Sequence, residues 1–222
     1  SYSLFINPTL CALNSSYRPL VVIYAQGLKE EDALLNYMIR NITEVRWKVV
    51  SGNLTYEDVE DAAMIIYVQV NPDINLTSNE IEAIKRWFNQ GGKTLWVTGD
   101  SDFKSEKVRD YLRILNTNRL LESVGSILRN EHTEVQDEYS HFGTEPYRLK
   151  AYVKPDLELS FLAENISKPI LFHGAAPIAL YVNGTWTPLY GAGKKVVKNI
   201  YRVVILSLIH ISEPTRPRLI SY

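Results

Sequence analysis

The stretch Leu76–Phe103, LTSNEIEAIKRWFNQGGKTLWVTGDSDF, decides the fold. Its first half predicts a helix, because Thr77 or Ser78 caps the amino end, Glu80 follows closely, and apolar residues recur at helical spacing up to a Gly-Gly stop. Lys93 to Thr98 then predicts a central, buried parallel strand. Polar residues directly after such a strand lie where α/β folds place their binding and catalytic groups.

The chain upstream repeats this alternation. Arg18 to Gly27 and Ala62 to Val70 are runs rich in β-branched residues that predict buried strands, and Val45 to Val50 predicts another. Leu28 to Thr43 predicts a helix with acids in its first turn, and Leu54 to Ala62 predicts a short acidic helix. Strands alternating with helices at this pace indicate a doubly wound parallel sheet of the α/β class.

Downstream, Ser105 to Arg129 predicts helix, with a break at Asn116–Asn118 and a pause at Gly125. Asn183-Gly184 lies between two alternating runs and predicts a β-hairpin. The predicted organisation is an N-terminal extension (1–17), an α/β domain (18–150), a small β-rich C-terminal extension (151–205) with a hairpin at 178–190, and a tail (206–222).

The tail, Leu206 to Tyr222, has the sequence LSLIHISEPTRPRLISY. It resembles the translated sequencing-adapter string that contaminates open reading frames at the ends of assembled contigs. Residues of such an origin are not selected to pack against a core. We therefore expect the tail to be non-native and to form no part of the fold.

Composition excludes some classes of function. The 222 residues carry a formal net charge of -1, so the chain has no basic surplus for a nucleic-acid partner. No apolar run reaches the roughly 18 residues of a membrane span. The single cysteine, Cys11, allows no internal disulfide, and its expected state is a small buried hydrophobe. The oligomeric state has no signal in the sequence.

Six Asn-x-Ser/Thr triplets indicate an exported glycoprotein, located outside the cell or at its surface. Chance composition would give about two such triplets. We expect every acceptor to lie at the surface, as a glycan requires. The acceptors are Asn14, Asn41, Asn53, Asn75, Asn165 and Asn183.

A family resemblance rests on the opening stretch together with AAMIIYVQV, NRLLESVGSILRNEHTEVQDEYSHFG and PILFHGAAP. Over Arg18 to Pro177 the chain resembles class I glutamine amidotransferase-like domains of the surface-protein type. These occur in archaeal and bacterial extracellular proteins and are related to gliding-motility and intraflagellar-transport domains. The resemblance implies a flavodoxin-like three-layer sandwich, and it is not specific for an activity.

Catalytic members of that superfamily end the fourth strand in a Gly-x-Cys-x-Gly elbow, whose backbone N–H groups face the oxyanion. Here the matching residues are Thr98, Gly99, Asp100, Ser101 and Asp102, with no cysteine and no glycine after the nucleophile position. The resemblance therefore implies a catalytically degenerate site.

We expect Gly99, Asp100, Ser101, Asp102 and His173 to bind a ligand without catalysis. The enzyme alternative is a hydrolase that uses Ser101 as nucleophile and His173 as base, with a carboxylate such as Asp137. The simpler interpretation of Asp100 and Ser101 is a helix cap.

Other site chemistries receive less support from the sequence. His132, Asp137 and His141 have irregular spacing for metal ligands, so no metal or cofactor is predicted. The 14 Tyr and 4 Trp residues allow a stacking platform for sugars or peptides, with Trp186 as its main candidate. The sequence thus predicts a non-enzymatic structural or ligand-recognition module whose partner is a surface protein, a saccharide or a peptide. A solute-binding component of a transporter is a further alternative.

Overall fold

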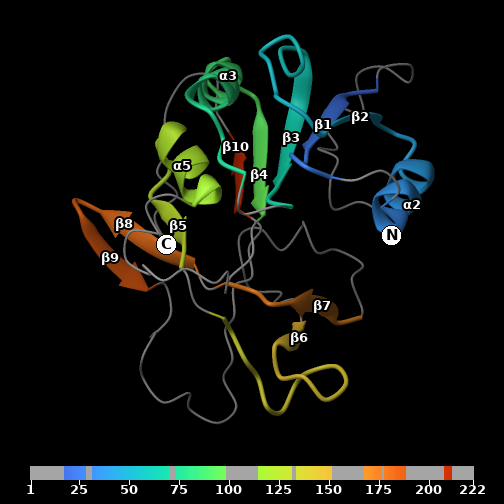
Figure 1. The fold of residues 1–222 in the computed structure, drawn as a ribbon, viewed down its shortest axis with the longest axis vertical. Helices are drawn as coiled ribbons and strands as arrows, with labels where there is room; N and C mark the ends of the chain where they lie inside the picture. Colours follow the sequence, from blue (N-terminus) through green and yellow to red (C-terminus); the bar gives the residue numbers. More distant parts are fainter. Residues whose placement is uncertain are drawn as a thin grey trace.

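The structure is a computed structural model that describes residues 18–28, 32–70, 74–98, 115–131, 134–151, 168–176, 178–188 and 208–211. Its main sheet has the strand order β10-β4-β3-β1-β2, in which β1 to β4 run parallel and β10 runs antiparallel to β4. Figure 1 shows these strands side by side. The strands are β1 (Leu20–Tyr24), β2 (Arg46–Val50), β3 (Ala62–Val68), β4 (Thr94–Thr98) and β10 (Leu208–Ile211).

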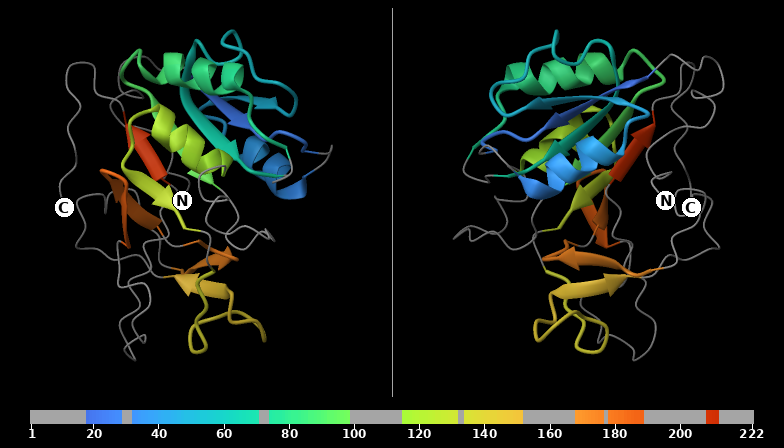
Figure 2. Two further views of the ribbon diagram at one scale, coloured as in Figure 1. Left: turned by 60° about the vertical axis from the view of Figure 1, so that its left-hand side comes forward. Right: turned by 90° about the vertical axis from the view of Figure 1, so that its right-hand side faces the viewer.

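Helices cover both faces of the sheet, which makes a mixed α/β fold. Because successive side chains of a strand point to opposite faces, β1 contributes to two separate cores. Val22 and Tyr24 pack with residues of α3 (Ser78–Phe88) and α5 (Asn116–Ser123). Val21 and Ile23 pack in the second core, against the α2 (Ala33–Asn41) side. Figure 2 shows α3 and α2 on opposite sides of the sheet.

The helix predicted from the opening stretch is confirmed as α3. Thr77 caps it, and Thr77 and Glu80 form a capping box, each satisfying a backbone N–H of the other. Trp87, with no exposed surface, fixes the helix to the sheet by donating from Nε1 to the Ala62 oxygen at 2.7 Å. The capping box at its start and the apolar residues on one of its faces together specify α3.

Two predicted helices differ in the structure. Residues 57–61 form a hydrogen-bonded turn instead of an acidic helix, because the chain enters β3 at Ala62. The Asp58 carboxylate accepts from the Thr55 amide at 2.8 Å and from the Thr55 hydroxyl at 3.1 Å, as a capping residue does at the start of a helix. In α2 the first turn holds no acidic residue, although the sequence predicted acids there. The acid at the amino end is the N-cap residue Asp32, whose side chain accepts from the Leu35 amide at 2.7 Å.

The region around Gly125 also departs from prediction. The break expected at Asn116–Asn118 corresponds to a helix start: Leu115 has a non-helical backbone, and these three residues form the first turn of α5. The residues before Leu115 lie outside the described part of the chain. Gly125 does end the helical segment with a φ of 76°, but the following Leu128–Asn130 forms strand β5 rather than more helix. Asn118 holds that strand, since its Nδ2 donates to the Asn130 oxygen at 2.9 Å and its Oδ1 accepts from the Asn130 amide at 2.8 Å.

Two small antiparallel sheets complete the described chain. One has the order β5-β8-β9 and contains the predicted hairpin, with positive φ at Asn183 and Gly184 as a type I′ turn requires. The other pairs β6 with β7. The boundary expected at residue 150 falls inside β6, and strand pairs cross it, so it does not separate two structural units. The bounds are β6 (Arg148–Ala151), β7 (Ile170–His173), β8 (Ile178–Val182) and β9 (Thr185–Pro188).

Two expectations about the sheet were wrong. The strand ending at Thr98 is not central to the parallel part, because β4 is its outermost member. The tail is not wholly outside the fold, because Leu208–Ile211 pairs with the entire length of β4. The second difference has a physical reason: an outermost strand presents N–H and C=O groups on its outer side, and another extended segment satisfies them.

Candidate binding site at the carboxyl edge of the sheet

The candidate site lies where β1, β3 and β4 end. Parallel strands bring their carboxyl ends to one edge of the sheet, and the predicted residues Gly99–Asp102 follow β4 directly. Those four residues lie outside the described part of the chain. The last described position, Thr98, accepts from the Gln69 amide at 3.3 Å. Gln69, beyond β3, therefore marks where the chain leaves β4.

Glu80 is the buried centre of this edge. Its carboxylate, in a residue only 2% exposed, accepts five hydrogen bonds from three separate segments. The Tyr24 hydroxyl donates at 2.7 Å, the Leu54 amide at 3.3 Å and the Gln26 amide group at 3.4 Å. Thr77 donates from its backbone at 2.7 Å and from its hydroxyl at 2.8 Å. We call these five residues the Glu80 corner.

The electrostatics of the corner keep Glu80 ionised at neutral pH. Burial alone would raise the pKa of its carboxyl, but the hydrogen bonds from the Thr77 amide, the Tyr24 hydroxyl and the Thr77 hydroxyl outweigh it and lower the pKa below its ordinary value. Burial and the bond to Glu80 raise the pKa of Tyr24. Tyr24 therefore stays a protonated donor and Glu80 a charged acceptor, so the pair serves structure.

The start of α5 fixes the segment that leads into α3. Asn116 accepts from the Leu76 amide at 3.0 Å and donates to the Ile74 oxygen at 2.7 Å. Arg119 donates to the Leu76 oxygen at 2.7 Å. These hydrogen bonds fix the segment before α3 to the first turn of α5, so the polar groups on this side of the edge already have partners within the protein.

A matched pair of glutamines remains at the edge. The neighbouring strands end in the same pattern, Ile23-Tyr24-Ala25-Gln26 and Ile66-Tyr67-Val68-Gln69, and the register pairs Ile23 with Ile66 and Tyr24 with Tyr67. The two tyrosine rings have centroids 5.7 Å apart. The Oε1 atoms of Gln26 and Gln69 are both buried, and among the described residues neither has a hydrogen-bond donor. The repeated Ile-Tyr-x-Gln pattern was a sequence signal for these residues that strand prediction alone did not use.

The residues proposed for a hydrolase are not brought together in the described part. His173 ends β7, where its backbone pairs with Arg148, and its side chain lies outside the described residues. Asp137 is occupied by its own turn, since Oδ1 accepts from the amides of Tyr139 at 2.8 Å and Ser140 at 2.9 Å. Ser101 lies outside the described residues, so its contacts stay a prediction.

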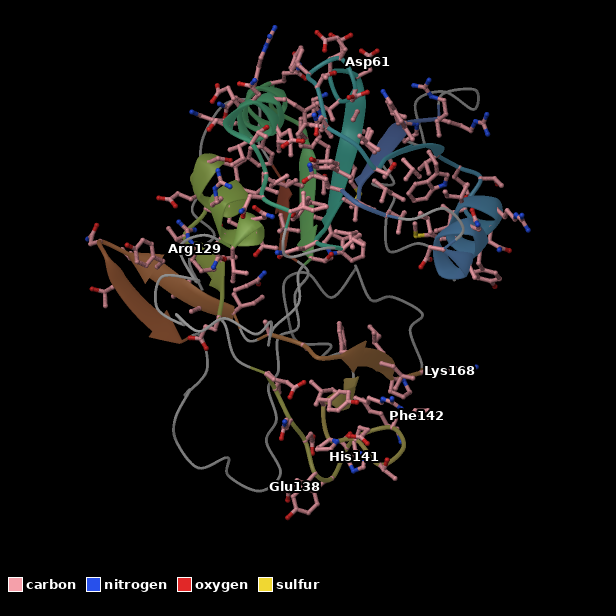
Figure 3. All side chains as sticks on the ribbon, viewed as in Figure 1. Asp61, Arg129, Glu138, His141, Phe142 and Lys168 are labelled. Carbon is pink, nitrogen blue, oxygen red and sulfur yellow. The ribbon has the colours of Figure 1, made fainter. Side chains whose placement is uncertain are left out.

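The segment between β5 and β6 carries His141, one of the residues considered as a metal ligand. His141 forms a bridge with Leu149, and its buried Nδ1 has no hydrogen-bond partner. Figure 3 shows His141 with Phe142 on this loop, apart from the main sheet. Within the described ranges, no three His, Cys, Asp or Glu side chains gather in a way that could hold a metal ion. His132 lies outside them.

The described glycosylation acceptors share one property, which is exposure. Asn41, Asn53, Asn75 and Asn183 are all exposed to solvent, and Asn14 and Asn165 lie outside the described residues. Among the predicted aromatic positions, the Trp186 side chain also lies outside them. Of the exposed aromatic rings within the described part, Tyr37 lies on α2, whereas Tyr139 and Phe142 lie on the segment between β5 and β6.

Comparisons with known proteins leave the family open. No family model matches the chain, and no curated protein matches it. One similar solved structure is the mmIFT52 N-terminal domain, at 13% identity and a TM-score of 0.49, covering 72% of this chain and 68% of that chain. A likeness at that score does not decide between α/β families. No helix among the described residues is long and apolar enough to cross a membrane.

Proposed function

We propose that the chain is a non-enzymatic recognition domain of an exported, cell-surface or membrane-associated protein, with an amidotransferase-like, flavodoxin-like fold. The observation that carries this proposal is the pair of unpartnered glutamine oxygens, Gln26 and Gln69, at the ends of neighbouring parallel strands. The ligand would be a saccharide or a peptide, either free or on a surface protein.

Strand order supports the flavodoxin-like part of the proposal. The parallel strands follow the order 2-1-3-4 across the sheet, which is the order in which flavodoxin-like folds begin. In such folds the strand order reverses between β1 and β3, and ligands bind in the crevice outside their carboxyl ends. Gln26 and Gln69 follow those two strands.

The chemistry of the edge favours binding over acid–base catalysis. A buried carbonyl oxygen without a donor costs about 1–3 kcal/mol, a cost that a ligand hydroxyl or amide N–H would remove. The carboxylate of the Glu80 corner already accepts five hydrogen bonds. The groups left to meet a ligand are therefore neutral carboxamides, which do not ionise at neutral pH and so do not serve as general acids or bases.

The exported location draws support from the exposed acceptors. A glycan needs an accessible asparagine, and Asn41, Asn53, Asn75 and Asn183 are exposed. Expression in a glycosylating host should give a protein whose mass falls on treatment with an N-glycosidase. An unchanged mass would remove the argument for export.

Two alternatives belong to other classes. A hydrolase would use Ser101 and His173, and a transporter component would bind a solute with a second lobe. A serine-reactive phosphonate probe separates the first from our proposal. We expect no labelling of Ser101 that His173→Ala abolishes, whereas labelling lost in both Ser101→Ala and His173→Ala would establish the hydrolase.

The unpartnered oxygens have their own test in Gln69→Met, because the Gln26 amide group also donates to Glu80 and its replacement would disturb the Glu80 corner. If the Gln69 oxygen is retained for a ligand, an apolar side chain of similar length should raise the free energy of unfolding of the ligand-free protein by about 0.5–2 kcal/mol. Urea denaturation measures the change. A loss of stability would mean that Gln69 serves the fold, and the recognition site would have to lie elsewhere.

A further inference from the structure

The outer edge of β4 is occupied by a segment from the far end of the chain. Leu208 pairs with Val97, Ile209 with Trp96, His210 with Leu95 and Ile211 with Thr94, all antiparallel. We propose that this edge is a strand-acceptor site, which takes an extended uncharged peptide through its backbone, and that Leu208–Ile211 is an exchangeable occupant of it. The partner is an extended segment of another protein that adds a strand to the sheet.

The pairing on the other side of β4 identifies the backbone groups that the site offers. Thr98 accepts from the Gln69 amide, so the backbone of Thr98 faces β3. Backbone groups of alternate residues in a strand face opposite neighbours. Those of Leu95 and Val97 therefore face outward, and each provides one N–H donor and one C=O acceptor for an added strand.

The side chains of β4 hold this strand in place from both faces of the sheet. Leu95 and Val97 are buried in the core beneath α3, with 0% and 2% of their surface exposed, and Trp96 packs against the core on the opposite face. Both faces of β4 pack against core residues, so the lateral edge is the side on which β4 meets an added strand. Such an edge is a rigid template.

The opposite edge of the sheet has the features that prevent pairing. β2 carries Arg46, which is exposed, and Lys48, which forms an ion pair with Asp58 at 2.8 Å. Charged side chains on an outermost strand discourage another strand from adding to it. β4, with the sequence TLWVT, carries no charge. One edge is protected and the other is receptive.

The occupant's sequence indicates that pairing is unspecific. Leu206–Tyr222 resembles a translated adapter string, so its residues would not be selected for β4. Backbone pairing needs only an extended conformation and uncharged, β-forming residues, which LIHI supplies. The same edge should therefore accept other segments of that kind.

Two proline variants of the full chain test the pairing. Since Val97 and Leu95 face outward, their partners Leu208 and His210 direct N–H groups at β4, and the N–H of Ile209 points away. His210→Pro removes a donor and should accelerate amide exchange at Leu95 and Val97 on the order of tenfold. Ile209→Pro is the matched control and should leave both amides protected. The Trp96 amide, which faces β3, should stay protected in both variants.

Exchangeability is tested in the same assay. Replacing the occupant by Leu208→Thr, Ile209→Val, His210→Thr and Ile211→Val together should keep Leu95 and Val97 protected. A capped peptide of residues 207–212, added in millimolar excess to His210→Pro, should restore their protection. The proposal is overturned if both proline variants behave alike, if the four-residue replacement loses protection, or if the peptide has no effect.

Discussion

The Glu80 corner and the outer edge of β4 belong to one sheet but are held in opposite ways. At the corner, a single carboxylate accepts hydrogen bonds from β1, from the segment before β3 and from the start of α3. At the β4 edge, four residues pair with Leu208–Ile211 as antiparallel strands through the backbone. The first arrangement depends on particular side chains, and the second depends only on an extended chain.

This difference shows where the sequence permits a single arrangement of the chain and where it accepts different segments. A buried carboxylate with dedicated donors permits one arrangement, because any other leaves a charge without hydrogen bonds. Backbone pairing fixes direction and register but hardly constrains sequence. The corner should therefore unfold with the whole domain, whereas the β4 edge should open locally and exchange its occupant.

The largest effect is expected from Glu80→Ala, which would break the corner. The variant leaves the Tyr24 hydroxyl and the amides of Leu54 and Thr77 without an acceptor, and should lose about 3–5 kcal/mol of unfolding free energy. Urea denaturation measures the loss. Glu82→Ala is the matched control on the same helix, because its exposed side chain has only a 3.6 Å ion pair with Lys85. Equal effects of the two variants would contradict a special role for the corner.

A smaller, pH-dependent effect is expected from Glu80→Gln. The pKa of Glu80 is lowered in the folded protein, so its contribution is complete above the unfolded-state pKa of about 4.3 and is lost as the pH falls through the lower folded-state value. At pH 7 the variant should be about 1–2 kcal/mol less stable than the wild type. That gap should narrow as the pH falls below about 4. A gap that stays constant down to pH 3 would show that the charge of Glu80 contributes nothing.

The smallest effect on stability is expected from Lys48→Thr, which makes the β2 edge resemble β4. Loss of the partly exposed pair with Asp58 should cost less than about 1 kcal/mol. The variant should instead self-associate more than the wild type in sedimentation experiments at matched concentration, because an uncharged edge pairs with other strands. Unchanged sedimentation would mean that charge is not what protects β2.

Much of the sheet follows from local sequence. The runs ending at Tyr24 and Val68 predict strands, and Thr77 with Glu80 predicts the start of α3, because β-branched residues and capping boxes act over a few residues. The turn at residues 57–61 was missed because Thr55 and Asp58 form the same kind of cap as at a helix start, while the chain enters β3 directly after the turn. Leu128–Asn130 was assigned to a helix because a strand of three residues is too short to show a period of its own.

The partners within the site could not be predicted in the same way. Tyr24 and Glu80 are 56 residues apart, and only the closed fold brings them together. The open side of β4 was missed for a related reason, since TLWVT is as apolar as a central strand and its sequence does not show how many neighbours it has. Charge on β2 and its absence on β4 is the sequence feature that distinguishes the two edges.

Native-state hydrogen exchange of the full chain over a range of low urea concentrations compares the two regions in one measurement. The amides of Leu54 and Thr77, which donate to Glu80, should exchange only with global unfolding, with a free energy that falls steeply as urea increases. The amides of Leu95 and Val97 should exchange through a local opening of lower free energy that hardly depends on urea. Identical free energies and urea dependence for all four amides would contradict an account in which the corner is fixed and the β4 edge is exchangeable.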